Sequence, residues 1–339
     1  MREKLLRRWG RFATRHPWWI IGVLMVVTVV CAGLASNLKL NMRYADMLPS
    51  DDEKAQEFDR ILTEFKTAST TIIVVQGEER AMKGFAERIV PQIATLFHCG
   101  LRPILVHGGG RQIDEACSRR GLQIVKHGGR RVTTRAVLQV VIDVVAGQLN
   151  QTFCRLLSQA NVPARGFAAA VSTAIRCQRR PPRVIDGRSV DFGEVGDVEA
   201  VAVDDLLGPA SERYVVPVLP SIGTLADGSQ VNVNADSVAA RVAVALRAQK
   251  LVMLSRVPGV MEHLDADGPI SQLTMRQTRE LKASDRVIGG MRAKLEEALR
   301  ALDGGVSQVH IISGIEPNTL LREIFTEEGC GTLITGGAT

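Results

Sequence analysis

From about residue 96 onward, apolar segments of strand length alternate with segments of helical periodicity. The segments 104–110 (ILVHGGG), 214–223 (YVVPVLPSIG) and 250–260 (KLVMLSRVPGV) are each an apolar run that ends in a turn. Residues 134–158 instead repeat valine and leucine at helical spacing, which gives a helix with one apolar face. Strands that alternate with helices of this length predict an α/β fold with an open, mainly parallel sheet between helices.

The same patterns place the other elements of this part of the chain. We expect helices at about 236–248, 274–283, 290–302 and 317–325, and strands at 308–312 and 332–335. Residues 174–200 carry turn signals in place of helical periodicity, and Asp186-Gly187 is a strong signal for a two-residue hairpin turn. This segment is therefore expected to form hairpins that project from the sheet.

Composition supports an aliphatic α/β core and argues against two other classes of protein. Aromatic residues make up only 4% of the 339 residues, and there are 31 glycines. The net charge of +6 is concentrated in residues 1–15, so no basic surface spreads over the folded part, and nucleic acid is not an expected partner. The six cysteines are far apart, which favours reduced thiols over a metal-ligand cluster or a disulfide framework.

An uncharged apolar segment, Trp18–Ala35, precedes the α/β part. It is about as long as the shortest helix that spans a bilayer. Two tryptophans stand at its edge and basic residues precede it, so we predict a single N-terminal membrane helix whose N-terminus faces the cytoplasm. A cleaved signal peptide and a buried soluble helix are the alternatives.

Residues 36–95 continue with a strand-like LKLNM, a turn at 48–51, a helical 52–66 and a strand at Thr70–Val75. Together with the helix before it, this segment resembles the N-terminus of resistance-nodulation-division exporters, particularly hopanoid-associated ones. No second apolar run of that length follows, so the chain is not expected to be a transporter by itself.

We therefore divide the chain into three parts. Residues 1–36 are the basic flank and membrane helix, and residues 37–95 are an exporter-like segment that could supply a first β–α unit. Residues 96–339 form the α/β domain.

Three polar motifs lie at the ends of predicted elements. His107–Gly110 (HGGG) follows a strand and precedes a helix, where glycine N–H groups and the helix N-terminus can bind an anion; glycine turns also occur for purely structural reasons. The motif VNVNAD of 231–236 precedes a helix, and Asp236 could be a simple N-cap there. The motif GGMRAK of 289–294 places Lys294 at the start of another helix, where a solvated lysine is the alternative.

Taken in this order, the motifs resemble N-acetylglutamate kinases of the amino-acid-kinase family. The resemblance covers about residues 96–336 and rests on HGGG, G-x-R-V-T, VDFGEVGDV, N-x-N-A-D, V-P-G-V, GGM-x-x-K and the closing EIFTEEGCGTLI. It implies the amino-acid-kinase fold, with ATP over the C-terminal half and the acyl amino acid over the N-terminal half. It also implies ATP with Mg²⁺ as the substrate complex, no tightly bound cofactor, and phosphorylation of the side-chain carboxylate of N-acetyl-L-glutamate in arginine biosynthesis.

The resemblance further implies which residues bind the substrates. Gly109 and Gly110 match residues at the reacting carboxylate and the γ-phosphate, and Gly108 matches one at the nucleotide phosphates. Arg131, the arginine of G-x-R-V-T, would pair with the α-carboxylate, a task that suits a bidentate guanidinium. Asn232 would hold the other substituents of the α-carbon.

Two residues are implied to be catalytic. Lys294 would stabilise the transferring phosphoryl group at the ATP phosphates, and Asp236 would orient catalytic lysines. We therefore expect Asp236 and Lys294 to lie close together and to face the glycine turn at Gly109–Gly110, although they are far apart in the sequence.

The first strand departs from the family pattern, in which it ends in K-x-G-G and its lysine contacts the phosphates opposite Lys294. Val75 and Gln76 stand where that lysine is expected, followed by a single glycine at Gly77, and Lys83 lies too far along the next helix to replace it. Losing one preorganised cation at a transferring phosphoryl group costs on the order of 10²–10³ in rate.

Two functions of different classes are therefore open. The first is an acetylglutamate kinase, a phosphotransferase with a carboxyl group as acceptor, impaired by the missing lysine. The alternative is a non-catalytic amino-acid-kinase-like binding or regulatory module. By resemblance the kinase domain is cytoplasmic and homo-oligomeric, whereas residues 18–35 would attach the chain to a membrane.

Overall fold

The computed structural model describes most of the chain from residue 70 onward. The described residues are 70–75, 82–127, 130–167, 173–185, 187–208, 214–262, 268–284, 286–287 and 289–336, with Trp18, Trp19, Gly22, Met25 and Thr28. The chain divides into two compact units, Met1–Ala55 and Gln56–Thr339, and the second contains every strand named below.

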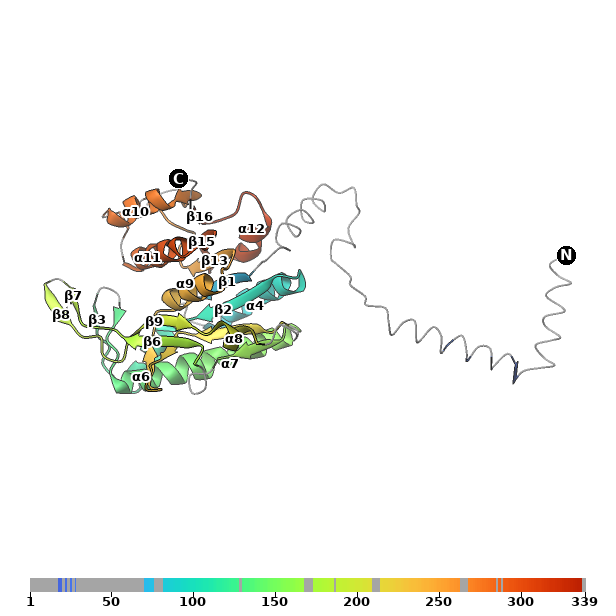
Figure 1. Ribbon diagram of the computed structural model, residues 1–339, viewed down its shortest axis with the longest axis horizontal. Helices are drawn as coiled ribbons and strands as arrows, with labels where there is room; N and C mark the ends of the chain where they lie inside the picture. Colours follow the sequence, from blue (N-terminus) through green and yellow to red (C-terminus); the bar gives the residue numbers. More distant parts are fainter. Residues whose placement is uncertain are drawn as a thin grey trace. The chain divides into compact units, whose positions relative to one another are not determined.

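An eight-stranded sheet forms the centre of the second unit (Figure 1). Its order is β14-β16-β15-β13-β1-β2-β10-β5, and every neighbouring pair is parallel except β15 and β16. The strands are β1 (Thr70–Val75), β2 (Arg102–His107), β5 (Ala164–Gly166), β10 (Val216–Pro220), β13 (Lys250–Ser255), β14 (Gln272–Thr274), β15 (Gln308–Ser313) and β16 (Thr332–Thr335). The predicted mainly parallel sheet is confirmed.

Helices cover both faces of this sheet because its central strands are apolar on both sides. Along β1 and β2, alternate residues face opposite layers: Ile73 and Leu105 pack on one, Ile72 and Ile104 on the other. The first layer holds α4 (Met82–His98), α5 (Gly110–Arg119), α6 (Arg135–Val141), the π-helical η2 (Ile142–Leu149), α7 (Asn150–Gln159) and α12 (Thr319–Phe325). The second layer holds α9 (Ala235–Ala245) and α11 (Gly289–Asp303). The remaining helices are α8 (Val203–Leu207) and α10 (Met275–Ala283).

Short strands between residues 126 and 232 form a second, smaller group of sheets. A four-stranded sheet has the order β12-β11-β6-β9, and the pairs β3–β4 and β7–β8 are two-stranded. The strands are β3 (Lys126–His127), β4 (Arg130–Arg131), β6 (Ile175–Arg179), β7 (Arg183–Ile185), β8 (Arg188–Val190), β9 (Gly196–Val201), β11 (Ile222–Thr224) and β12 (Gln230–Asn232).

The hairpin predicted at Asp186-Gly187 is confirmed by the register of β7 and β8. Ile185 pairs with Arg188, which leaves two residues in the turn, and Gly187 has a φ of +75°, a conformation that favours glycine. In Figure 1 this hairpin projects from the body of the unit.

The strand β1 lies in the middle of the large sheet. It pairs with β2 from Thr70↔Arg102 to Val75↔His107, and on its other side with β13. The segment 37–95 therefore contributes a central strand to the α/β domain, and α4 follows this strand as the first helix of the fold.

One continuous helical segment in the described part of the chain, Arg135–Gln159, is long and apolar enough to cross a membrane. It comprises α6, η2 and α7, and buried residues such as Val140, Val145 and Phe153 place it in the hydrophobic core. It is a core helix of the α/β unit. The predicted membrane helix Trp18–Ala35 lies almost entirely outside the described residues and stays a prediction, as does the exporter resemblance of the residues before β1.

Candidate active site

The glycine turn joins the end of β2 to the start of α5. Gly109 precedes the helix and packs so closely against η2 that a Cβ atom there would lie 2.7 Å from Leu149 Cδ1. Gly110, the first residue of α5, is exposed, and a Cβ atom on it would meet nothing within 4 Å. The predicted strand–glycine–helix arrangement is confirmed, and the N–H groups in the first turn of such a helix have no partner within the helix itself.

A buried histidine fixes the end of β2 in front of this turn. The side-chain amide nitrogen of Asn150 donates to Nε2 of His107 at 3.1 Å and to the carbonyl oxygen of Val218 at 2.9 Å. Since Nε2 accepts, the imidazole is neutral and its proton lies on Nδ1, 3.4 Å from the carbonyl oxygen of Gly108. Burial lowers the pKa of His107 to about 4, which agrees with a neutral ring.

Arg131 of β4 reaches back to the glycine turn. Its Nη2 donates to the carbonyl oxygen of Gly110 at 2.8 Å and pairs with Asp114 of α5. Lys126 approaches the other oxygen of Asp114 at 2.7 Å, so this carboxylate is held between two cations. The Nε atom of Arg131 is buried and has no hydrogen-bond partner in the described part of the chain. The guanidinium therefore retains a buried donor beside the turn.

Asn232 links β12 to the segment that follows β4. Its side-chain nitrogen donates to Thr133 Oγ1 at 3.0 Å, and its backbone N–H donates to the carbonyl oxygen of Glu194 at 3.0 Å. Thr133 is completely buried and lies two residues after Arg131. Asn232 is thus held beside Thr133, two residues from Arg131, which contacts the glycine turn.

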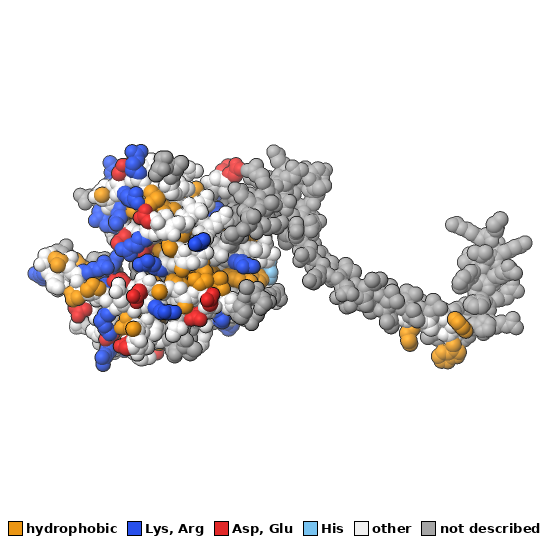
Figure 2. Space-filling model, in the orientation of Figure 1, with side chains coloured by type: hydrophobic (Ala, Val, Ile, Leu, Met, Phe, Trp, Pro, Cys, Tyr) orange, Lys and Arg blue, Asp and Glu red, His pale blue; other side chains and the backbone are white. Residues whose placement is uncertain are grey.

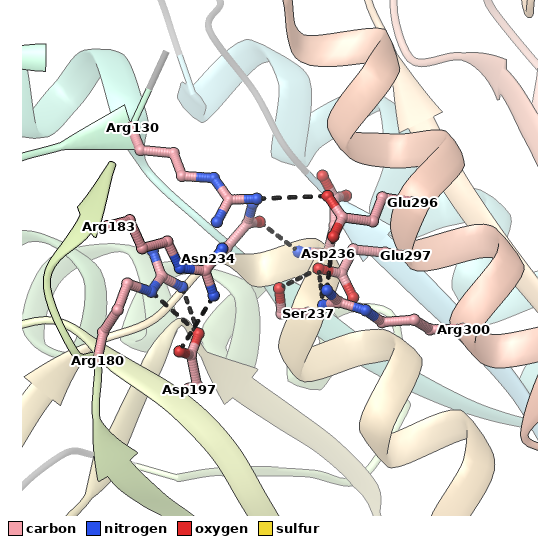
Figure 3. Close-up of polar contacts among 10 residues, drawn as sticks. All are labelled: Arg130, Arg180, Arg183, Asp197, Asn234, Asp236, Ser237, Glu296, Glu297 and Arg300. Atoms are coloured by element: carbon pink, nitrogen blue, oxygen red, sulfur yellow. Dashed lines mark hydrogen bonds and ion pairs between the residues drawn. The ribbon is translucent and has the colours of Figure 1, made fainter. Parts of the chain in front are cut away.

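Asp236 and Lys294 form a buried ion pair between α9 and α11. Lys294 Nζ lies 2.8 Å from Asp236 Oδ1, and the two residues are 6% and 1% exposed. The alternative of a solvated lysine is therefore wrong. The N-cap alternative for Asp236 is also wrong, because Asn234 caps α9 by accepting from the Asp236 N–H at 2.8 Å (Figure 3). The predicted proximity is confirmed; that both side chains face the glycine turn stays a prediction.

A second polar bridge joins the same two helices next to this ion pair. Ser237 Oγ donates to Glu297 Oε1 at 2.7 Å, and Arg300 Nη1 donates to the same oxygen at 2.9 Å (Figure 3). Burial raises the pKa of Glu297, and the hydrogen bond from Ser237 and the charge of Arg300 oppose that rise. Sequence reasoning did not single out either Ser237 or Glu297.

Three arginines lie near one another beside α11: Arg130 of β4, Arg180 directly after β6, and Arg183 of β7 (Figure 3). Arg180 binds Asp197 through Nε at 3.0 Å and Nη2 at 2.5 Å, and Arg183 approaches the same carboxylate at 3.5 Å. Arg130 pairs across with Glu296 of α11 at 3.6 Å. Burial, followed by the charge of Arg180, lowers the pKa of Arg130. In Figure 2, basic side chains gather on the side of the molecule that carries α10, α11 and the β7–β8 hairpin.

These contacts place the predicted site residues in two groups. Arg131 contacts the glycine turn, and Asn232 contacts Thr133, two residues after Arg131. Asp236 and Lys294 form a separate pair, and α9, which carries Asp236, follows β12 in the chain. Helix N–H groups, a guanidinium and a buried ammonium suit the binding of anions.

The sequence analysis predicted the site residues but not the side chains that hold them in place. Asp114 stands one turn after the glycine turn, and its pairing with Arg131, 17 positions away on β4, had no signal in the sequence. Glu297 stands three positions after Lys294, so it shares the helix face that a buried helix would reserve for apolar residues. Gly129 of the G-x-R-V-T motif, and Gln76 with Gly77, lie outside the described residues.

Comparison with known proteins relates the chain to one family. The amino acid kinase family matches residues 68–313. The acetylglutamate kinase of Myxococcus xanthus (strain DK1622) is 38% identical over 250 residues, which cover 72% of this chain and 81% of the relative. The acetylglutamate kinase of Symbiobacterium thermophilum is 38% identical over 272 residues, 79% of this chain and 92% of the relative.

Among solved structures, the N-acetylglutamate synthase of Neisseria gonorrhoeae, complexed with coenzyme A and N-acetyl-glutamate, superimposes with a TM-score of 0.71 at 25% identity. The match covers 86% of this chain and 65% of that one.

Proposed function

The chain belongs to the amino acid kinase family, and on that premise we propose that it transfers the γ-phosphoryl group of ATP to the side-chain carboxylate of N-acetyl-L-glutamate, a step of arginine biosynthesis. Relatives at 35–38% identity that are named acetylglutamate kinase support the proposal. The observation that carries it is the buried ion pair of Asp236 and Lys294, in a chain that also places Arg131 against the glycine turn.

The acceptor would bind between the glycine turn and β12. Arg131 would use its buried, unpartnered Nε to bind the α-carboxylate, while Asp114 and the Gly110 carbonyl hold the guanidinium in place. Asn232 would contact the acylated α-nitrogen region, and the N–H groups at Gly109 and Gly110 would receive the reacting side-chain carboxylate.

The nucleotide would be bound as its Mg²⁺ complex, with the phosphates at Gly108 and Lys294. One oxygen of the acceptor carboxylate attacks the γ-phosphorus, the bond to the bridging oxygen breaks, and ADP leaves with that electron pair; the product is an acyl phosphate. No proton transfer to the acceptor is needed because the carboxylate is already ionised. The protein's contribution is positioning and positive charge on the equatorial oxygens, which Lys294 would supply while Asp236 fixes its direction.

Three incubations of the full-length chain test the proposal: ATP and Mg²⁺ with N-acetyl-L-glutamate, with unacylated L-glutamate, and with no acceptor. We expect ADP release and trapping of an acyl phosphate by hydroxylamine only with the acetylated acceptor. ADP release without an acceptor, or equal rates with both acceptors, would contradict the proposal.

The binding-module alternative gives a different outcome in the same samples. It is favoured by Val75 and Gln76, which stand where the resemblance places a lysine. Calorimetric binding of N-acetyl-L-glutamate without any ADP release, at enzyme concentrations that would detect a rate lowered by about 10³, would support a binding or regulatory module in place of a kinase.

The setting of this reaction is also a proposal. We propose that the kinase domain acts in the cytoplasm as a homo-oligomer, and that residues 18–35, when present in the mature protein, attach it to a membrane. Sequencing the N-terminus of the endogenous protein decides whether that segment is retained, and light scattering of the purified chain gives the oligomeric state.

A further inference from the structure

The second bridge between α9 and α11, from Ser237 to Glu297, places another carboxylate beside the proposed catalytic pair. Asp236 and Glu297 are both carboxylates, and Lys294 is a buried ammonium that pairs with Asp236 and stands three residues before Glu297 on α11. Residues three apart on a helix are neighbours on its surface, so Lys294 and Glu297 are within reach of each other. An ion pair between them would compete with the pair that Lys294 makes with Asp236.

Two donors other than Lys294 bind the Glu297 carboxylate. The Ser237 hydroxyl and the Arg300 guanidinium both bond to Oε1, at 2.7 and 2.9 Å. Ser237 follows Asp236 directly on α9, so the ion pair and the hydroxyl bridge form side by side and fix the same helix against α11. The other charged groups that act on Glu297 are Glu296, Asp236 and, from β4, Arg130.

The core shared by the two helices mixes small and larger side chains. Ala239 and Ala243 of α9 and Ala298 of α11 are small, whereas Val242 of α9 and Leu295 of α11 are larger. The polar bridges add directional contacts between the same two helices.

We propose that Ser237 is a positioning residue that directs the Glu297 carboxylate away from Lys294, so that the ammonium stays with Asp236 and remains available to the transferring phosphoryl group. The inference rests on the proposed kinase function for its kinetic consequence, although the side-chain geometry that it describes does not. Without the hydroxyl, Glu297 turns to Lys294 and neutralises it.

The kinetic test compares Ser237→Ala with the double variant Ser237→Ala/Glu297→Gln. Ser237→Ala should lower kcat about 10- to 100-fold with little change in KM, because a cation used in the transition state is neutralised. The double variant should recover most of that loss, since a neutral amide cannot form an ion pair with Lys294. Ser237→Thr, which keeps the hydroxyl, should retain activity.

A matched control separates this effect from the general loss of a serine hydroxyl. Ser229→Ala also removes a serine-to-carboxylate hydrogen bond, to Asp227 at 2.6 Å, but in an exposed turn between β11 and β12. It should leave kcat within about 3-fold of the parent chain. If Ser237→Ala is as active as Ser229→Ala, or if the double variant is no more active than Ser237→Ala, Ser237 has only a structural role and the proposal is overturned.

A measurement that needs no activity separates the inference from the proposed function. The pKa of Glu297 can be followed by carbon-13 NMR of labelled glutamate carboxyl groups, with the Glu297→Gln variant assigning the signal. In Ser237→Ala the pKa should fall, because Lys294 as a new partner favours the charged carboxylate. A rise would mean that only a donor was lost, which overturns the inference. A parent chain without kinase activity would contradict the proposed function and leave this NMR test valid.

Discussion

The two buried cations of the candidate site differ in how many of their donor atoms have a partner. Lys294 has its carboxylate partner within 2.8 Å, while Arg131 keeps a buried Nε that makes no hydrogen bond to any described residue. A buried donor without a partner is costly, and a bound carboxylate would remove that cost. At the scale of single residues, the buried Nε favours the proposed role of Arg131 in binding the acceptor.

Replacing Arg131 by alanine should raise the KM for N-acetyl-L-glutamate by about 10- to 100-fold and change kcat much less. A charged hydrogen bond to the non-reacting carboxylate is equally strong in the ground state and in the transition state. Steady-state kinetics with varied acceptor measure both constants. Arg130→Ala is the matched control, because Arg130 pairs with Glu296 and not with the glycine turn, and its effect on KM should be smaller. An unchanged KM in Arg131→Ala would remove the assignment.

Lys294→Met should lower kcat by about 10²–10³, because a preorganised charge at the transferring phosphoryl group is lost. It also leaves Asp236 buried without its partner, so the free energy of unfolding should fall by about 3–5 kcal/mol. The double variant Asp236→Leu/Lys294→Met replaces the ion pair by apolar groups and should regain stability but no activity. Urea titrations and initial rates on the same preparations measure both; recovery of activity in the double variant would contradict a catalytic role.

At the scale of elements, the informative feature is the position of β1. An empty place beside β2 and β13 would expose two strand edges in the centre of the sheet, which is unfavourable, and the apolar run Ile72–Val74 fills it. The expectation that Thr70–Val75 docks at this place is confirmed. The backbone at Val75 is in register with His107, directly before the glycine turn.

Placing a lysine at the end of β1 should therefore raise phosphoryl transfer. We expect Val75→Lys or Gln76→Lys to increase kcat by about 10²-fold or more, because the variant adds a cation at the end of the strand next to the glycine turn. Val75→Met is the control of similar length without charge and should give no increase. If neither lysine variant is faster and calorimetry detects no ATP binding to either, the phosphates do not lie at this end of β1.

At the scale of the whole molecule, histidines that are buried as neutral rings link the stability of the sheet to pH. His107 lies at the end of β2, and His310 of β15 lies with Nδ1 2.7 Å from Glu323 of α12. Burial lowers the pKa of both histidines, that of His107 to about 4. Both rings belong to strands of the large sheet, so protonating them opposes the packing of the entire unit.

The free energy of unfolding should accordingly fall as the pH is lowered from about 6.5 to 4. In this window the unfolded chain binds a proton on His107 while the folded chain does not, so stability declines by up to about 1.4 kcal/mol per pH unit for this ring, and the lowered pKa of His310 contributes a decline of the same sign. Denaturant titrations at pH 7.5 and 5 measure the decline. His107→Gln, which keeps an acceptor for Asn150, should reduce it; an identical pH dependence in this variant would show that His107 is not the neutral buried ring described above.

The sequence by itself determined the elements and the positions of the motifs. Short apolar runs placed β1 and β15, helical spacing placed α10 and α11 to within a residue or two, and Asp186-Gly187 located a hairpin turn. These features follow from interactions over a few neighbouring residues, which is why local patterns report them. Motif order, through resemblance to a family, also indicated that Asp236 and Lys294 would meet.

Only the tertiary structure decided which partner each of these side chains has. That Asp114 holds Arg131 depends on how α5 meets β4, and that Ser237 holds Glu297 depends on how α9 packs against α11 in one layer. These contacts join elements that are distant in the chain, and a polar side chain in a sequence can be satisfied by many alternative partners. The packing of two helical layers on one sheet selects a single partner, because every other buried donor and acceptor must be satisfied at the same time.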